Sequence, residues 1–265
     1  MCCTLLMRPL VLRRRSYALT DVGRKRPQNE DAFLADDTLG LYVVADGVGG
    51  HAKGEVASAE SVEQVRNFVS ANFHPVAAFL DGSAEDSGER RTALRRLLES
   101  AVQSACYLVF SMAEQDPDGL GMSTTLSAML LAGDQAVIAQ VGDSRVYRKS
   151  DGKAQQITID HTLINHQLPQ GLITAEQART MRGRNVITRA VGHHDYVEVD
   201  TFEVDLCRGD RFLLCTDGLH GVLAPGEVET LLAEPTVEAA ARRSIELANE
   251  RGGKDNITAL VVGIA

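Results

Sequence analysis

The stretch from Thr124 to Arg148, TTLSAMLLAGDQAVIAQVGDSRVYR, decides the fold of this chain. It contains three short apolar runs, Thr124–Leu131, Ala136–Val141 and Arg145–Arg148, which are separated by Gly-Asp pairs. Short apolar runs that end at such turns are typical of β-strands joined by tight connections. Because strands follow one another without helices between them, the sequence argues against a doubly wound parallel sheet.

Helices are predicted on both sides of this strand-rich stretch. Apolar residues recur every three or four positions in Gly54–Phe68 and in about Thr92–Glu114, which is the helical period. Further strands are expected at Gly40–Ala45, Val197–Val204, Arg211–Cys215 and Ile257–Ile264, and further helices at Pro225–Leu232 and Val237–Glu250. This order favours antiparallel sheets packed together, with helices outside.

Polar segments interrupt the predicted elements at two places. Leu80–Arg90 is rich in Asp, Glu, Gly and Ser, which predicts a loop. The stretch Ile159–Arg184 is an irregular excursion with two short helical segments, around Ile164 and Ala178. The 265 residues suit one domain, preceded by an N-terminal arm at residues 1–15.

The N-terminus and the cysteines suggest a cytoplasmic protein. Arg13, Arg14 and Arg15 follow the first apolar residues, whereas a secretory signal has its positive charges before them. No run of 18 apolar residues is present, so no membrane span is expected. The five cysteines are an odd number without regular spacing, which does not suggest a disulfide framework.

The charge balance excludes one class of partner. Acidic residues outnumber basic ones by 36 to 27, and the net charge is −9. Nucleic acids are bound mainly through Lys and Arg, so the chain has no general attraction to them. The excess of carboxylates fits either plain solubility or several Asp side chains that converge on bound cations.

Acidic residues recur at the ends of apolar strands. They are Asp46, Asp143, Asp217, Asp255 and the pair Glu30-Asp31. If the strands lie side by side, these carboxylates meet at one rim, where they must protonate, pair with Lys or Arg, or bind hard cations. No Cys-His cluster with zinc spacing is present, and ligation by oxygen alone points to Mg²⁺, Mn²⁺ or Ca²⁺. Taken one at a time, each Asp-Gly pair also fits an ordinary turn.

One motif lies outside turn chemistry. Residues 21–31 read DVGRKRPQNED, in which a basic cluster runs directly into an acidic one. The planar guanidinium of Arg26 can hold a phosphate while the neighbouring acids hold metal. This arrangement points to a phosphate-binding site beside a cation site.

Eight motifs together carry a family resemblance. In chain order they are DVGRKRPQNED, VVADGVGGHAKGE, MSTTL, VGDSRVYR, DHT, NVITRAVG, LLCTDGL and GGKDNIT. They resemble the protein phosphatase 2C (PPM) family in its bacterial form, from about Ser16 to Gly263. The resemblance implies an α+β fold with a central β-sandwich of two antiparallel sheets, flanked by helices on both sides. It also implies one catalytic domain at residues 16–265, with a flap at about 159–184.

The resemblance further implies a metal centre with two Mn²⁺ or Mg²⁺ ions. Asp46 would bridge the ions, the carbonyl of Gly47 would bind one of them, and Asp217 and Asp255 would bind the other. The remaining roles that it implies are metal-bound water for Glu30 and Asp31, a third and weaker ion for Asp143, and the substrate phosphate for Arg26.

The activity implied is that of a protein serine/threonine phosphatase, in which a metal-bridging hydroxide attacks the phosphomonoester directly. The partners implied are phosphorylated proteins, including a Ser/Thr kinase and its substrates, and the chain is expected to be a monomer. One departure matters, because Val48 stands where many eukaryotic members have a His proposed as general acid. His51 and His161 are candidates for that role, although a structural role suits either better.

Two other classes of function are open to the same residues. A phosphoprotein-binding pseudoenzyme would keep the fold without turnover, but such a chain should have lost a metal-binding Asp, and this one retains all four. A metal-dependent nuclease also uses two ions. The negative net charge and the lack of a basic, aromatic-rich patch argue against it.

Overall fold

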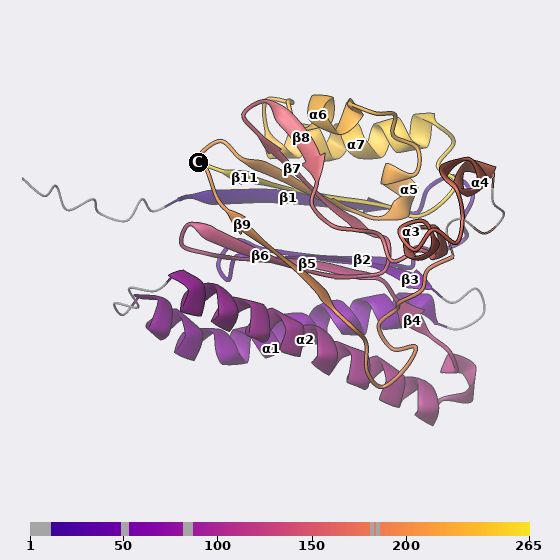
Figure 1. The fold of residues 1–265 in the computed structure, drawn as a ribbon, viewed down its shortest axis with the longest axis horizontal. Coiled ribbons are helices and arrows are strands. Elements are labelled where there is room, and N and C mark those ends of the chain that lie inside the picture. Colours follow the sequence, from indigo (N-terminus) through magenta and orange to yellow (C-terminus); the bar gives the residue numbers. More distant parts are fainter. Residues whose placement is uncertain (1–11, 49–52, 82–86, 181–182, 184–185) are drawn as a thin grey trace, which may run out of the picture.

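The fold is a sandwich of two antiparallel sheets with helices on both outer faces (Figure 1). The computed structural model describes residues 12–48, 53–81, 87–180, 183 and 186–265. In the described part of the chain, no helix combines the length and the apolar character that crossing a membrane requires. The predicted class, α+β with four layers, is confirmed.

The first sheet holds the two ends of the described chain. Its strand order is β1 (Arg14–Asp21), β11 (Ile257–Ile264), β10 (Arg211–Cys215), β7 (Arg145–Ser150) and β8 (Lys153–Gln156). Helix α7 (Val237–Glu250) packs on its outer face, together with the short helices α5 (Asp217–His220) and α6 (Glu227–Leu231).

The second sheet is built mainly from the stretch that decided the fold. Its order is β2 (Asp31–Asp36), β3 (Leu41–Val48), β5 (Leu126–Ala132), β6 (Gln135–Val141) and β9 (Asp200–Asp205), and β4 (Ser123–Thr124) pairs with the end of β3. Two long helices, α1 (Gly54–Asp81) and α2 (Ser87–Gln115), cover its outer face (Figure 1). A short 3-10 helix, η1 (Pro117–Gly119), follows α2.

Strand β3 shows why the sandwich has three apolar layers. Successive side chains of a strand point to opposite faces. Leu41, Val43 and Ala45 therefore join the core beneath α1 and α2. Tyr42 and Val44 join the core between the two sheets. A third cluster fills the space between the first sheet and α7. Because β3 is buried on both faces, it is an apolar run and not an alternating one.

Several predicted boundaries change in the structure. The predicted loop at Leu80–Arg90 is wrong at both ends, since α1 continues to Asp81 and α2 begins at Ser87. Residues 82–86 lie outside the described residues. The polar composition of this segment conceals the ends of the two long helices, which pack on each other. Strand β1 includes Arg14 and Arg15, which the prediction assigned to the arm.

The flap region contains more regular secondary structure than the sequence analysis predicted. It contains α3 (Leu163–Gln167) and α4 (Ala175–Thr180), at the two places where short helical segments were predicted. Both lie with α5 at one end of the sandwich, on the right in Figure 1. Strand β8 was not predicted, because its sequence, KAQQ, is short and largely polar.

Candidate metal centre

The strand-end carboxylates meet in one cavity of about 330 Å³. The predicted site residues that line it are Arg26, Glu30, Asp46, Gly47, Asp143, Asp217 and Asp255. They come from both sheets and from the loop before β2, so that segments more than 200 residues apart face one another. Asp31 lies next to this group, directly opposite Asp46 in the β2–β3 register.

Asp46 is fixed through its backbone. Its N–H donates to the hydroxyl of Thr125 at 3.0 Å, and the hydroxyl of Thr124 donates to its carbonyl at 2.9 Å. These bonds join the end of β3 to the segment between β4 and β5, leaving the Asp46 carboxylate toward the cavity. Gly47 is confined as well, because a Cβ atom there would lie 2.3 Å from the carbonyl oxygen of Gly54. Only glycine fits at this close approach.

Asp31 is held by two threonines that the sequence reasoning missed. The hydroxyls of Thr216 and Thr258 donate to its Oδ2 atom at 2.8 and 2.7 Å. Its other oxygen, Oδ1, is buried without a hydrogen-bond partner. An unpaired buried acceptor is costly, and it points to a donor or cation that the apoprotein does not supply. No charge or periodicity marks these threonines in the sequence.

Asn256 joins the motif at residues 21–31 to β11. Its Oδ1 atom accepts the N–H of Glu30 at 2.9 Å, and its amide donates to the carbonyls of Val22 and Gln28 at 3.0 and 2.9 Å. This side chain sets the path of the loop on which Arg26 and Glu30 lie. Its neighbour, Asp255, is thereby brought to the basic motif.

The cavity concentrates negative charge. Burial is the main cause that raises the pKa of Asp46 well above its ordinary value, and neighbouring carboxylates, with Asp31 first, add to it. Burial also raises the pKa of Asp31 to about 7, against the effect of the two threonine bonds. Burial and the nearby charge of Asp217 raise the pKa of Asp143 to about 7. Burial and Asp255 raise the pKa of Asp217.

These residues fit a hard divalent cation. Oxygen ligands, a glycine that lets a backbone carbonyl approach, and an orphaned carboxylate oxygen are what Mg²⁺ and Mn²⁺ require. Within the ranges that the structure describes, no three His, Cys, Asp or Glu side chains already surround one point closely enough to hold an ion. The cation Arg26 instead pairs with Asp255, at 2.7 Å between Nη2 and Oδ2.

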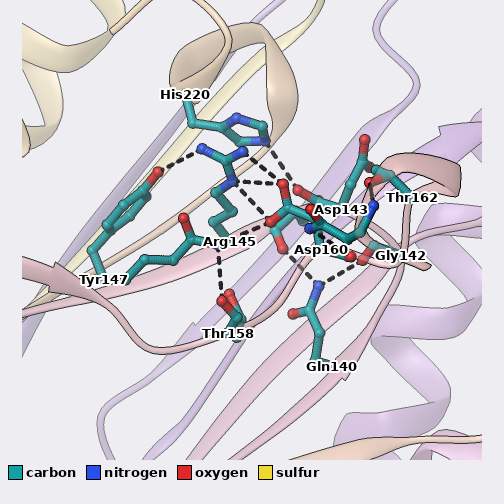
Figure 2. Close-up of polar contacts among 12 residues, drawn as sticks. Gln140, Gly142, Asp143, Arg145, Tyr147, Thr158, Asp160, Thr162 and His220 are labelled. Carbon is teal, nitrogen blue, oxygen red and sulfur yellow. Dashed lines mark hydrogen bonds and ion pairs between the residues drawn. The ribbon is translucent and has the colours of Figure 1, made fainter. Parts of the chain in front are cut away.

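The loop Gly142–Ser144, here called the Asp143 loop, is held by a network of buried polar groups (Figure 2). The amide of Gln140 donates to the carbonyls of Gly142 and Ser144 at 3.0 and 2.7 Å. The hydroxyl of Ser144 lies 2.8 Å from that of Thr125, which also accepts the N–H of Asp46. The Asp143 loop and the end of β3 are therefore parts of one hydrogen-bonded unit.

A second cavity of about 330 Å³ adjoins the first and shares Asp143 and Asp217 with it. Arg145 lines this cavity and forms a bidentate ion pair with Asp160, with distances of 2.6–3.0 Å (Figure 2). The guanidinium also donates to the hydroxyl of Tyr147 at 3.0 Å. The ion pair of Arg145 is thus with Asp160, and its charge acts on Asp143 from a distance and only partly offsets the raised pKa of that carboxyl.

The histidine candidates are now placed. His161 is buried, its Nδ1 atom accepts the N–H of Gly142 at 3.2 Å, and its Nε2 atom lies 3.1 Å from Asp200. Both ring nitrogens are engaged and His161 is not among the residues that line the first cavity, which favours the structural role over the general-acid role. His51 lies outside the described residues. His220, which the sequence did not mark as a site residue, lines the second cavity and binds the Asp143 loop.

Cysteine chemistry is not part of the site. Cys215 is fully buried in β10, and burial raises the pKa of its thiol to about 12. A thiol in that state is a poor nucleophile at neutral pH. Cys106 is buried and free, in agreement with the prediction, whereas Cys2 and Cys3 lie outside the described residues.

Comparison with known proteins gives consistent results. The sequence profile of the family described as protein phosphatase 2C matches residues 24–261. The serine/threonine phosphatase stp of Listeria innocua is 38% identical over 247 residues, which cover 92% of this chain and 93% of that protein. The serine/threonine protein phosphatase PstP of Mycobacterium tuberculosis is 36% identical over 250 residues, 94% of this chain and 45% of that protein.

Solved structures agree with the sequence matches. The crystal structure of the Mycobacterium tuberculosis phosphatase PstP superposes with a TM-score of 0.78 at 36% identity, over 94% of this chain and 98% of that one. The catalytic domain of PstP in complex with 2 manganese ions superposes with a TM-score of 0.79 at 35% identity, over 96% and 99% of the two chains.

Proposed function

The chain belongs to the protein phosphatase 2C family and is a metal-dependent protein serine/threonine phosphatase, and we propose that the carboxylates of its cavity hold the ions that this activity needs. The observation that carries the proposal is the convergence of Asp46, Asp143, Asp217 and Asp255 on one cavity. Arg26 and Arg145 offset their mutual repulsion only in part, because the pKa values of Asp46, Asp143 and Asp217 stay raised, and a divalent cation would relieve it.

Each residue has a proposed place in the metal centre. Asp46 would contribute to both ions, the carbonyl of Gly47 would help to hold one of them, and Asp217 and Asp255 would hold the other. Glu30 and Asp31 act through water, which suits the orphaned Oδ1 atom of Asp31. Asp143, which faces both cavities, helps to hold a third and weaker ion.

The chemistry divides between the ions and the chain. When bound, Mn²⁺ or Mg²⁺ activates water toward phosphorus and neutralises the charge that develops on the phosphate oxygens. Arg26 orients the phosphate through its planar fork of donors. The apolar side chains of Val48 and Ile187 line one part of the cavity and exclude water there. Val48 carries no proton, so it cannot protonate the leaving serine or threonine oxygen.

The substrates are phosphorylated proteins, and we propose that they include a Ser/Thr kinase and its targets. We also propose that residues 16–265 act as one catalytic domain, with the flap at about 159–184 beside the cavity. The absence of nucleic-acid and membrane partners, the monomeric state and the cytoplasmic location stay predictions.

The direct test is hydrolysis of p-nitrophenyl phosphate and of phosphopeptides by the purified protein. We expect turnover that requires added Mn²⁺ or Mg²⁺ and disappears with EDTA. Asp217→Asn and Asp255→Asn should each lower kcat by about 100-fold or more, because each removes a proposed metal ligand. Asp195→Asn, an exposed carboxylate away from the cavity, is the matched control and should leave turnover unchanged. Full activity in EDTA would show that the proposal is wrong.

A further inference from the structure

The Asp143 loop is held from two sides by histidines, and we propose that His161 and His220 are positioning residues that set the place of the Asp143 carboxylate in the metal centre. The inference rests on the proposed role of Asp143 as a ligand of the third ion. It assigns to the two histidines a task that acts through the backbone of the loop and not through contact with substrate.

His161 holds the start of the loop. Its Nδ1 atom accepts the backbone N–H of Gly142 at 3.2 Å, and the backbone N–H of His161 donates to the carbonyl of Gly142 at 2.9 Å. Because Nδ1 accepts, the ring proton lies on Nε2 and faces Asp200 in β9, at 3.1 Å. Arg189 donates to the other oxygen of Asp200 at 2.7 Å and fixes it in turn.

His220 holds the loop from the opposite side. Its Nε2 atom donates to the carbonyl of Asp143 at 3.0 Å (Figure 2). His220 ends α5, three residues after Asp217, which begins the same helix. The bond therefore joins the element that carries Asp217 to the loop that carries Asp143, and these are the two carboxylates shared by the adjoining cavities.

The Asp143 carboxylate depends on this support. Among the hydrogen bonds of the described residues, none joins its side-chain oxygens to the side chain of another residue. The nearby Arg145 is paired with Asp160 instead. The carboxyl is hydrogen-bonded to its own backbone N–H and has no side-chain partner among these bonds, so its position follows the loop backbone, and the histidines that bind this backbone position the ligand.

Gln140 and Ser127 keep the loop folded when a histidine is lost. They bind the carbonyls of Gly142 and Ser144, with distances of 2.7–3.1 Å, and they do not contact His161 or His220. Substitution of a histidine is therefore expected to loosen the position of Asp143 without unfolding the sheet. This separation makes the inference testable in the folded protein.

The variants are chosen to remove the side-chain hydrogen bonds of one histidine at a time and then to restore the bond to the loop. His161→Leu and His220→Leu delete the ring nitrogens, whereas His161→Asn restores an acceptor in place of Nδ1 and His220→Gln restores a donor in place of Nε2. Each is made in the natural background and in Asp143→Asn. Binding of Mn²⁺ to the metal-free protein is followed by the room-temperature electron paramagnetic resonance signal of the free ion, and folding is followed by thermal unfolding.

We expect each Leu variant to weaken the weakest Mn²⁺ site about tenfold, which is the usual effect of losing a residue that orients a ligand. The Asn and Gln variants should recover most of that affinity. In the Asp143→Asn background the weakest site should be lost, and the histidine substitutions should change nothing further. If a histidine had only a structural role, its substitution would instead weaken the remaining Mn²⁺ sites, and by the same factor in both backgrounds.

Two results distinguish a failure of the positioning role from a failure of the third-ion assignment. If Asp143→Asn removes the weakest site but neither Leu variant weakens it, the positioning role is wrong and the proposed metal centre stands. If Asp143→Asn leaves every Mn²⁺ site intact, Asp143 is not a ligand, and both the third-ion assignment and the inference built on it are wrong.

Discussion

The Nη2 atom of Arg26 lies 2.7 Å from the Oδ2 atom of Asp255, although the two residues are 229 positions apart in the chain. The residue proposed to bind phosphate thus neutralises a residue proposed to bind metal. The hydrogen bond to Asp255 is the main cause that raises the pKa of Arg26. Both side chains are partly exposed, so the pair contributes little stability and can be exchanged for stronger partners.

Arg26→Ala should separate substrate binding from metal binding. Loss of the guanidinium should raise KM for p-nitrophenyl phosphate by about tenfold and change kcat little, because the interaction lost is one that already binds the ground state. The same variant should bind Mn²⁺ at least as tightly as the natural protein, since Asp255 no longer has a competing cation. Lys25→Ala, the exposed neighbour, is the control. A large fall in kcat with unchanged KM would contradict the assignment.

Asp217→Asn and Asp255→Asn should differ in stability in the metal-free protein, although both are expected to lower kcat. Asp217 has a raised pKa through burial and its neighbour Asp255, so removal of its charge should increase the melting temperature in EDTA. Asp255 is paired with Arg26, so its neutralisation should give no such increase. Thermal unfolding of both variants in EDTA checks this contrast, which would fail if the two melting temperatures shifted alike.

Metal binding should release protons, and more of them below neutral pH than above it. The pKa values of Asp31 and Asp143 are raised to about 7 in the apoprotein, from an ordinary value of 3.8. A carboxyl with a raised pKa stabilises the fold fully only below its unfolded pKa and loses that contribution as the pH rises through 7. At pH 6 both groups still hold protons, which the ion must displace.

Calorimetric titration with Mn²⁺ in buffers of different ionisation enthalpy measures this release. We expect a larger release at pH 6 than at pH 8, and a smaller release at pH 6 in Asp143→Asn. The melting temperature of the metal-free protein should fall between pH 6 and pH 8, and saturating Mn²⁺ should remove that fall. A release that does not depend on pH would show that these carboxyls are already ionised.

The sequence predicted the layers and the acidic rim for identifiable reasons. Strands buried on both faces, such as β3, are apolar runs, and Asp46 at the end of that run marks where the chain reaches the rim. The helix Val237–Glu250 and the strand Ile257–Ile264 were predicted with the bounds they have, because each has a clear period or composition.

The support for the rim could not be predicted in the same way. Thr216, Thr258 and Asn256 act through hydrogen bonds to residues distant in the chain, and no local pattern records such contacts. The role of His220 could not be predicted, because a lone histidine after an Asp-Gly pair shows nothing of the loop that it meets 77 residues earlier in the chain. Tertiary contacts of this kind appear only when the strands are placed.

Gly218→Ala should disturb the metal centre by steric means alone. A Cβ atom at Gly218 would lie 2.0 Å from the carbonyl oxygen of Asn256, so α5 and the start of β11 must separate, and Asp217 and Asp255 must separate with them. Overpacking of this kind costs about 1–3 kcal/mol.

Gly119→Ala is the matched control, because its Cβ would meet nothing closer than 3.6 Å. We expect Gly218→Ala to lower both the free energy of unfolding and the affinity for Mn²⁺, measured by urea denaturation and by metal titration, and Gly119→Ala to change neither by a comparable amount. Equal effects of the two substitutions would mean that the close contact of α5 with β11 does not hold the two carboxylates together.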